Sequence, residues 1–397
     1  MFDREFIANP YPTYARLREA APLHWLPEFG EGAWLIPRYD DVVSALQEPR
    51  LSAKRSHRFV AQYPLEQQAA FADFNRLFAM WVVFLDAPRH AVWRKLMTKG
   101  FPAATITAAR PRIVALTHRL IDRVYASGRM DFIRDFAYPL PAMVMLDLLG
   151  VSPDDQEKVI GWTDDIASFF GNARSPIETA ERARTALFSL SDYFKAVLEM
   201  RRASPGGDLV SLLLQAEEAD DRITPEELAA QCSALLFGGH ETTRNLLGNG
   251  LLALLRNRDQ LDLLRRDPTL VPAAVREMSR YDTPAQLGSR VVGESFEMHG
   301  RELKKGQIVI TMFGSANRDP AKFTNPDSLD ITRKGAPNLS FGKGTHFCIG
   351  SVLATLEAEA TVATVLERMP NLRLAQQELK WVNNINFRGV QALPLEF

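Results

Sequence analysis

Apolar residues recur along most of the chain at the spacing i, i+3, i+4, i+7, which is typical of amphipathic helices. The longest segments with this spacing cover residues 106–126, 180–202, 225–256 and 349–368. Short apolar runs flanked by glycine and charged residues predict a few strands, at residues 32–39, 289–300, 307–313 and 390–397. No repeat or flexible Gly/Ser linker divides the chain. We therefore predict one mainly α-helical domain over residues 1–397, with small peripheral β-sheets.

The stretch FGKGTHFCIG, residues 341–350, holds one of only two cysteines in the chain. It follows a long segment rich in proline and asparagine, and long loops of this kind are often functional. Its three glycines, Gly342, Gly344 and Gly350, permit tight or positive-φ conformations and a close approach to a flat group. A helical pattern begins directly afterwards, so Cys348 lies just ahead of a helix N-terminus, where the helix dipole favours the thiolate.

A thiolate in a glycine-rich loop suits a metal ligand. One alternative is that Cys348 is a buried residue that acts as a small hydrophobe. Another is a catalytic nucleophile, which needs a neighbouring base. His346 is close in sequence, but in an extended loop its side chain would point elsewhere.

The pattern over 225–256 predicts one long helix that begins with a capping signature, TPEE at residues 224–227. Its middle, FGGHETTRN at 237–245, places two adjacent glycines in the helix interior, where each costs about 1 kcal/mol relative to alanine. The Thr242 hydroxyl can bond the Gly238 carbonyl four residues back, opening the helix locally and leaving room for a ligand. The alternative is a close helix crossing, with Glu241 in solvent.

The charge balance and the cysteine count exclude several classes of function. The 47 basic residues against 48 acidic ones give no basic excess, so we expect no nucleic-acid partner. Two cysteines are too few for a disulfide framework or a zinc cluster, which favours a reducing, cytoplasmic location. The N-terminus shows neither a signal peptide nor an apolar run long enough to span a membrane, so we expect a soluble protein without a membrane anchor.

The pattern F-G-x-G-x-H-x-C-x-G resembles the haem-binding loop of the cytochrome P450 haem-thiolate monooxygenases. Its specified positions are all present, as Phe341, Gly342, Gly344, His346, Cys348 and Gly350. The resemblance implies the cytochrome P450 fold, a large triangular helical domain with small peripheral sheets. It also implies haem b as the cofactor and Cys348 as the ligand of its iron. Similar segments occur in the family's order along essentially the whole chain, at residues 9–18, 32–46, 316–323 and 387–395.

The mid-helix stretch is similar to the family's oxygen-activation motif, G-G-x-(D/E)-T. By this resemblance Thr242 and Glu241 are the catalytic residues, which steady dioxygen and relay protons. Gly238 is then a cofactor-binding position on the same helix.

A further stretch, AAVREMSRYDTP at 273–284, resembles the family's E-x-x-R helix. Glu277 and Arg280 would pair on one helix face, and the implied role of the pair is to lock the cysteine loop. Many members add an arginine from a P-(D/E)-R-F stretch, but here residues 326–329 read PDSL. Arg333, a few residues later, is the candidate substitute.

The two propionates of haem need cationic or hydrogen-bonding partners. Four residues resemble the family's propionate ligands: His90 and Arg94 in LDAPRHAVWRKLM, Arg290 at the start of a strand, and His346 in the cysteine loop. Basic residues around that loop, Arg94, Lys95, Lys99 and Lys343, are candidates for docking an acidic redox partner.

The resemblance also implies a substrate pocket with an apolar and aromatic lining. Its predicted residues are Phe78, Trp81, Phe84, Leu85, Leu235, Phe237, Ala285, Leu287 and Ile385. Such a lining fits an apolar substrate of natural-product size, such as a terpenoid, polyketide or fatty-acid derivative.

The implied function is hydroxylation or epoxidation of that substrate with O2. The electrons would come from a separate ferredoxin or flavodoxin and its reductase, and we expect a monomer. The alternatives are atypical chemistry of the same family, namely desaturation, aryl coupling or C–C cleavage, and a non-enzymatic haem-thiolate carrier or gas sensor.

Overall fold

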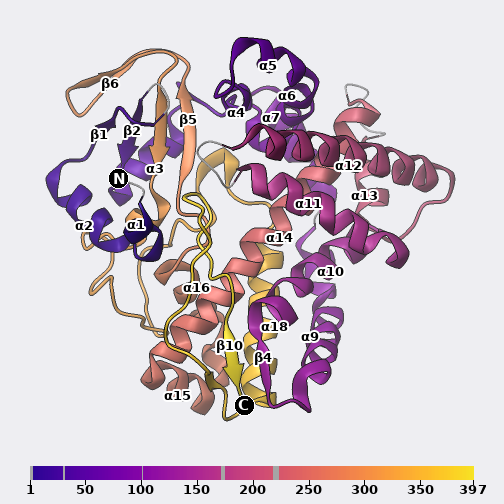
Figure 1. The fold of residues 1–397 in the computed structure, drawn as a ribbon, viewed down its shortest axis with the longest axis vertical. Coiled ribbons are helices and arrows are strands. Elements are labelled where there is room, and N and C mark those ends of the chain that lie inside the picture. The colour runs from indigo at the N-terminus through magenta and orange to yellow at the C-terminus, as the bar shows by residue number, and fades with distance from the viewer. Residues whose placement is uncertain (1–2, 30–31, 101, 171–174, 218–222) are drawn as a thin grey trace. The chain divides into compact units, whose positions relative to one another are not determined.

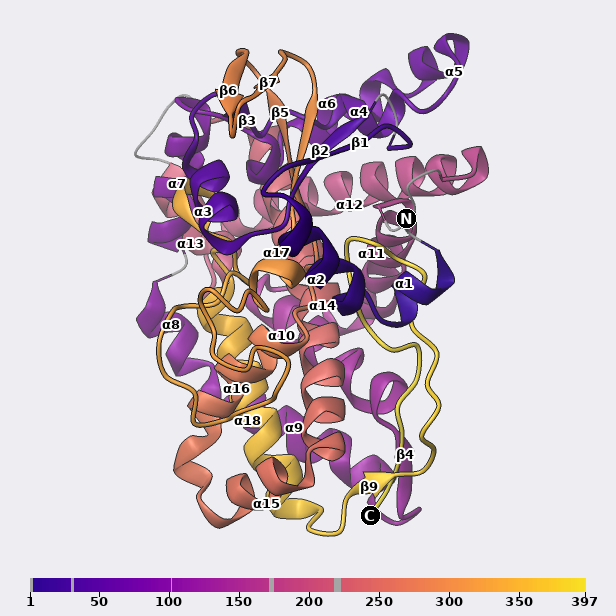
Figure 2. The same ribbon diagram turned by 90° about the vertical axis from the view of Figure 1, so that its left-hand side faces the viewer.

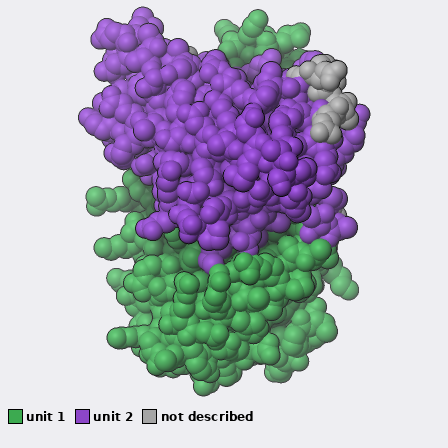
Figure 3. Space-filling model, turned by 90° about the vertical axis from the view of Figure 1, so that its right-hand side faces the viewer, with its two compact units in different colours: residues 1–51, 106–141, 241–397 green, residues 52–105, 142–240 purple. Residues whose placement is uncertain are grey.

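The computed structural model describes residues 3–29, 32–100, 102–170, 175–217 and 223–397 (Figures 1 and 2). Its contacts divide the chain into two compact units, coloured in Figure 3. Unit 1 comprises residues 1–51, 106–141 and 241–397, and unit 2 comprises residues 52–105 and 142–240. Because the chain enters unit 2 twice and returns twice, neither unit is one continuous stretch of sequence. The single domain expected over 1–397 stays a prediction.

Unit 1 contains the main β-sheet, whose strand order is β1-β2-β8-β5-β3. The strands are β1 (His24–Leu26), β2 (Ala33–Ile36), β3 (Leu51–Ser52), β5 (Gly288–Val292) and β8 (Ile308–Thr311). Strand β8 pairs with β2 in parallel and with β5 in antiparallel fashion. Two smaller sheets join β4 (Arg129–Asp131), β10 (Pro394–Glu396) and β9 (Arg373–Leu374), and β6 (Phe296–Met298) with β7 (Arg301–Leu303).

The two faces of the main sheet bury different apolar clusters, as the alternation of side chains along a strand requires. Ile36 and Val309 belong to one cluster, together with residues of the following helix. Their neighbours Leu35 and Ile310 belong to the other, which also contains Phe6 from the N-terminus. The sheet of unit 1 is therefore buried on both sides.

Some helices of unit 1 pack against this sheet, and others form a separate group that includes α9 (Arg110–Tyr125), α16 (Val271–Tyr281) and α18 (Ser351–Arg368). The other helices of unit 1 are α1 (Arg4–Ala8), α2 (Tyr11–Ala20), α3 (Tyr39–Gln47), α15 (Arg258–Arg266) and α17 (Phe313–Ala316). Helix α18 packs against both α9 and α16 (Figure 2).

Unit 2 consists mainly of helices. They are α4 (His57–Val60), α5 (Leu65–Ala70), α6 (Ala72–Ala79), α7 (Arg89–Gly100), α11 (Gln156–Phe170), α12 (Ile177–Ala203) and α13 (Leu209–Glu217). Three helices have residues in both units: α8 (Ala103–Ala108), α10 (Pro139–Leu148) and the long α14 (Pro225–Arg256).

The long helices predicted from apolar spacing are confirmed, with one correction. The segment 106–126 forms two helices, α8 and α9, instead of one. Pro111 lies in the first turn of α9, and proline there cannot continue a helix from the preceding residues because it lacks an N–H and its ring crowds an earlier carbonyl.

The strands are shorter than the sequence suggests. The segment 289–300 divides into β5 and β6, and the N–H of Gly293 between them donates to the Arg50 carbonyl at 2.7 Å. None of the helices in the described ranges is long and apolar enough to cross a membrane.

Helix α18 buries an acidic side chain, Glu357, which is 1% exposed. Its Oε2 has no hydrogen-bond partner among the residues that the structure describes. Burial raises the pKa of this carboxyl from 4.5 to about 8, so the neutral form prevails in the folded protein near pH 7.

We therefore expect the stability of the protein to depend on pH through Glu357. The pKa of Glu357 is higher in the folded state than in the unfolded state. The stability that the protonated carboxyl allows is therefore complete below about pH 4.5 and is lost as the pH rises through about 8. The Glu357→Gln variant, which stays neutral, should gain stability relative to the parent on the order of 3 kcal/mol between about pH 5 and pH 9. Denaturant unfolding at each pH measures this gain. The exposed Glu367→Gln change on the same helix is the control, and an equal pH response in both variants would contradict the assignment.

Candidate active site

The loop around Cys348 has the conformation that its glycines permit. Gly342 and Gly344 have φ angles of +69° and +75°, which side chains rarely adopt. A Cβ on Gly344 would also lie 3.1 Å from the Leu46 carbonyl oxygen. The loop closes through a hydrogen bond from the Cys348 N–H to the Phe341 carbonyl at 2.9 Å. The tight, positive-φ backbone that the glycines allow is thus present at Gly342 and Gly344.

The third glycine, Gly350, has an ordinary φ of −82° and forms the N-cap of α18. A Cβ at this position would lie 3.9 Å from the Cys348 sulfur. The structure confirms that Cys348 lies two residues ahead of this N-cap, with its side chain exposed. The alternative of a buried, hydrophobic Cys348 is therefore excluded.

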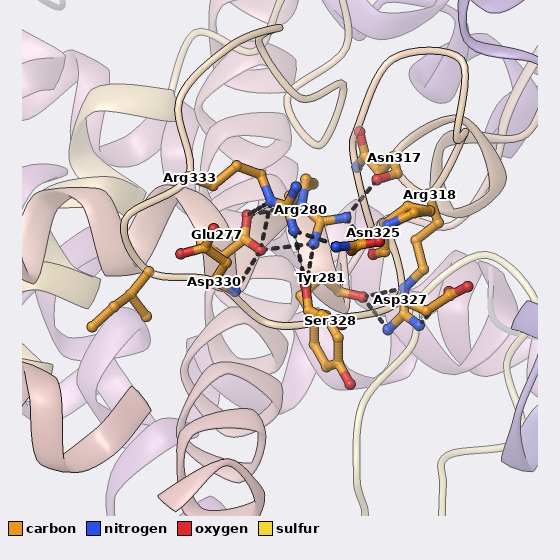
Figure 4. Close-up of polar contacts among 12 residues, drawn as sticks. Glu277, Arg280, Tyr281, Asn317, Arg318, Asn325, Asp327, Ser328, Asp330 and Arg333 are labelled. Carbon is orange, nitrogen blue, oxygen red and sulfur yellow. Dashed lines mark hydrogen bonds and ion pairs between the residues drawn. The ribbon is translucent and has the colours of Figure 1, made fainter. Parts of the chain in front are cut away.

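The predicted Glu277–Arg280 pair is buried on α16, with side chains 3% and 2% exposed. Arg280 binds the glutamate bidentately, at 2.7 and 2.8 Å. Its guanidinium also donates to the carbonyls of Asn317, Pro326 and Ser328 at 2.8–3.1 Å (Figure 4). A buried ion pair stabilises a fold only when its other hydrogen-bonding capacity is satisfied, and here the loop backbone satisfies it.

Arg333 is the third partner of this pair, as its place in the sequence suggested. Its Nε lies 3.0 Å from Glu277 Oε1, and the Asp330 N–H donates to the same oxygen at 3.0 Å (Figure 4). Arg333 also donates to the carbonyls of Thr324 and Asn325. We refer to Glu277, Arg280 and Arg333 as the arginine–glutamate lock.

Two polar residues that we did not predict, Asn317 and Ser340, connect the lock to the cysteine loop. The backbone carbonyl of Asn317 accepts a hydrogen bond from Arg280. Its side-chain Oδ1 accepts the Leu339 N–H at 2.6 Å, and its Nδ2 donates to Ser340 Oγ at 3.0 Å. Ser340 Oγ in turn donates to the Ser279 carbonyl of α16 at 2.6 Å. The backbone immediately before Phe341 is therefore fixed to α16.

Helix α14 begins with the predicted capping box. The Thr224 N–H donates to Glu227 Oε2 at 3.0 Å, and the Glu227 N–H donates to Thr224 Oγ1 at 3.2 Å. The helix then runs without interruption to Arg256, so the local opening expected near the glycines does not break it.

The two glycines of α14 have different surroundings. A Cβ on Gly239 would lie 2.7 Å from Met145 Cγ, so this glycine is needed for packing. A Cβ on Gly238 would meet no described heavy atom within 4 Å. Gly239 therefore permits a close contact and Gly238 borders open space, while a ligand beside Gly238 stays a prediction.

Glu241 carries an ion pair that the sequence did not predict. Arg244, one turn later, donates to both of its oxygens at 2.9 and 3.2 Å, and Asn245 donates to Oε1 at 3.1 Å. The side chains of Glu241 and Arg244 are 17% and 15% exposed. The carboxylate is thus held by two donors on its own helix and remains in contact with water. The i, i+3 spacing of opposite charges was the available signal.

The four predicted propionate ligands belong to different units. In unit 1, Arg290 of β5 is 8% exposed and its Nη1 donates to the Ser289 carbonyl at 2.8 Å, while His346 is half-buried in a short 3₁₀ turn. In unit 2, His90 is 5% exposed and Arg94 follows one turn later on α7. Their propionate role stays a prediction.

Most predicted pocket residues of unit 2 share one aromatic cluster. Ring centroids of Trp81 and Phe237 lie 5.4 Å apart, those of Phe78 and Trp81 4.7 Å, and those of Phe78 and Phe84 6.1 Å. Phe170, which the sequence analysis missed, joins this cluster at 5.3 Å from Phe237. Leu235 is buried on α14, and Leu85 is half-buried.

The predicted pocket residues of unit 1 are less uniform. Ala285 forms an isolated antiparallel bridge with Phe387, close in sequence to Ile385. Leu287 packs against the N-terminal apolar cluster that includes Phe6. Leu287 is therefore in contact with the apolar core of unit 1, and its role in the pocket stays a prediction.

The residues present fit haem. Cys348 offers an exposed sulfur at the end of a glycine loop, and the porphyrin of haem would itself supply four nitrogen ligands, so one cysteine from the protein would be enough to hold the iron. Within the described ranges, no three His, Cys, Asp or Glu side chains gather at a spacing that would hold a bare metal ion.

Comparison with known proteins identifies the family of the chain. The sequence model of the cytochrome P450 family matches residues 79–380. The chain is 35% identical to the biotin biosynthesis cytochrome P450 of Bacillus subtilis, over 99% of this chain and 97% of that protein. It is 38% identical to the cytochrome P450 monooxygenase PikC of Streptomyces venezuelae, over 99% and 92%. The crystal structure of P450BioI in complex with acyl carrier protein ligated to hexadec-9Z-enoic acid superposes with a TM-score of 0.91 and 34% identity, over 99% of both chains.

The chain belongs to the cytochrome P450 family. It has the fold of that family, haem b is its cofactor, and it is a monooxygenase. The non-enzymatic alternative is thereby set aside.

We expect Arg333→Ala to lower the free energy of unfolding by about 3 kcal/mol, because it leaves the buried Glu277 carboxylate with a single cation. The variant should also lose haem more readily on dilution, which the Soret absorbance reports.

Arg373→Ala is the matched control. It removes an arginine from an exposed pair with Glu396, whose side chains are 56% and 45% exposed, and should cost less than about 1 kcal/mol. Equal losses in the two variants would show that the lock adds no more than a surface pair.

Proposed function

We propose that this monooxygenase hydroxylates a long-chain fatty acyl group, free or carried on an acyl carrier protein. The observation that carries the proposal is the largely buried aromatic cluster of Phe78, Trp81, Phe84 and Phe237, in which Phe237 stays partly exposed next to Gly238, a position with open space beside it. Pockets for apolar ligands are lined predominantly by hydrophobic and aromatic side chains of this kind. The similarity to P450BioI, whose crystal structure contains acyl carrier protein bearing hexadec-9Z-enoic acid, supports the same class.

Bound haem supplies the iron at which dioxygen is activated. In the proposal the Cys348 thiolate would be the protein ligand of the iron, favoured by its place ahead of the α18 N-terminus. Thr242 carries its hydroxyl on the same helix as Gly238, which leaves room beside it, and would hold a proton for the reaction.

Glu241 is the proton carrier in this account. Its carboxylate is bound by Arg244 and Asn245 and is partly exposed, so it can take a proton from water when one of these bonds opens. Thr242, the next residue, then passes the proton inward. Arg244 therefore competes with proton uptake at the Glu241 oxygens.

The electron donor in this proposal is a separate acidic ferredoxin or flavodoxin with its reductase. Lys95 and Lys99 are exposed one turn apart on α7. Exposed positive side chains suit a transient contact with an acidic partner. A monomeric state and a cytoplasmic location remain part of the proposal.

Substrate class is tested by optical titration of the ferric holoenzyme. Hexadec-9Z-enoic acid, free and linked to acyl carrier protein, should shift the Soret band at lower concentration than testosterone does. Hydroxylated acyl products should follow when a ferredoxin and its reductase are added. A response to the steroid alone would reject the acyl proposal.

Changing Thr242 to alanine tests its role. We expect NADPH oxidation to continue while product per NADPH falls by at least about tenfold, because proton delivery loses its donor. The neighbouring, buried Thr243→Ala change is the control and should keep normal coupling. Unchanged coupling in Thr242→Ala would mean that the hydroxyl has no part in the reaction.

A further inference from the structure

Two segments of unit 1 that carry predicted pocket residues, 283–288 and 384–389, are paired with each other. The contacts are Gln286 N–H to the Asn386 carbonyl at 2.8 Å, Arg388 N–H to the Pro284 carbonyl at 2.8 Å, and the antiparallel bridge between Ala285 and Phe387. We refer to these two segments as the paired segments. They are too short to form a stable sheet, so other contacts must fix their position.

Arg388 supplies most of these contacts. It is 7% exposed, and its guanidinium donates to Asp282 Oδ1 at 2.7 Å and to the carbonyls of Ile7 and Ala8 at 2.8 and 3.1 Å. The same group stacks 3.5 Å above the Trp381 ring. One arginine thus ties the C-terminal segment to the end of helix α1.

Tyr11, at the start of α2, completes the arrangement. Its hydroxyl donates to Asp282 Oδ1 at 2.6 Å, and burial together with this carboxylate raises the pKa of the phenol, which keeps it a donor. Three residues later, Tyr14 donates to Gln286 Oε1 at 2.9 Å. Both tyrosines of α2 therefore bind the segment around Ala285.

Helix α14 holds the paired segments from another side. Asn249 Nδ2 donates to the carbonyl of Arg388 at 2.9 Å and to that of Asp282 at 3.3 Å. A Cβ on Gly389 would lie 2.0 Å from Asn245 Oδ1, so the C-terminal segment touches the residue that binds Glu241. The paired segments are thus anchored on the helix that carries the catalytic residues.

We propose that Tyr11, Asp282 and Arg388 form a clamp through which the N-terminal helices set the position of one wall of the substrate pocket. These are positioning residues, which act through Ala285 and Ile385. The inference rests on the proposed function together with the prediction that Ala285 and Ile385 line its pocket. A preordered wall lowers the cost of binding a large ligand, because less backbone must be ordered on binding.

The Tyr11→Phe variant tests the clamp with little disturbance, since the ring stays in place under Arg318 and only the hydroxyl is lost. Hydrogen bonds to charged groups contribute about 1.5–3 kcal/mol, so amide exchange in 283–288 and 384–389 should rise by about tenfold. Tyr193→Phe is the matched control, because it also removes a phenol-to-aspartate hydrogen bond, to Asp155. It should leave exchange in these segments unchanged.

Ligand binding to the ferric holoenzyme provides a second measurement. Imidazole, which is small, should bind Tyr11→Phe as it binds the parent, whereas the bulky azole clotrimazole should bind at least about threefold more weakly. Arg388→Lys keeps the positive charge but loses the three-way guanidinium contact, and it should show the same change in the affinity ratio. A general loss of stability would not change this ratio selectively.

The outcomes separate the clamp from the proposed function. Exchange and affinity ratio at parental values in both variants would overturn the clamp. A parent protein that binds neither azole at its iron would overturn the haem-thiolate function, while the exchange measurement would still decide whether the clamp exists.

Discussion

One buried carboxylate, Glu277, determines where the cysteine of this protein can lie. It accepts hydrogen bonds from Arg280, Arg333 and the Asp330 N–H, and each arginine in turn donates to loop carbonyls. Removing these charges from water is costly, and only a fully bonded arrangement offsets that cost. Because the lock is complete, the loop over 317–340 has one defined path, and this path delivers Cys348 to the start of α18.

Helix α14 performs several tasks at once. Gly239 lets Met145 approach, and Gly238 leaves open space. One turn further, Glu241 is bound by Arg244 and Asn245, and Asn249 holds the paired segments that the clamp positions. The Glu241 carboxylate and the paired segments are thus bound by neighbouring residues of one helix.

The parts that could be predicted from the sequence depend on short spacings. The capping box of α14, the glycine loop around Cys348 and the Glu277–Arg280 pair each lie within ten residues, so local geometry nearly determines them. Arg333 could be proposed because a known partner was missing and an arginine lay nearby.

The contacts that escaped prediction join distant parts of the chain or depend on details of packing. Tyr11 and Asp282 are 271 positions apart, and nothing in either stretch indicates the other. The contact of Leu287 with the N-terminal apolar cluster was not evident from the sequence either. The helical spacing of apolar residues likewise continues through Pro111, although the helix itself is interrupted just before this proline.

The most direct test of the account is the Soret band of the reduced, CO-treated holoprotein in two cysteine variants. Cys232 is buried and its thiol pKa is raised to about 12, so Cys232→Ala should keep the long-wavelength band that thiolate ligation gives. Cys348→His should move the band to the shorter wavelength of an imidazole-ligated haem. If Cys348→His retained the band of the parent, the sulfur of Cys348 would not be the iron ligand, and the account would be wrong.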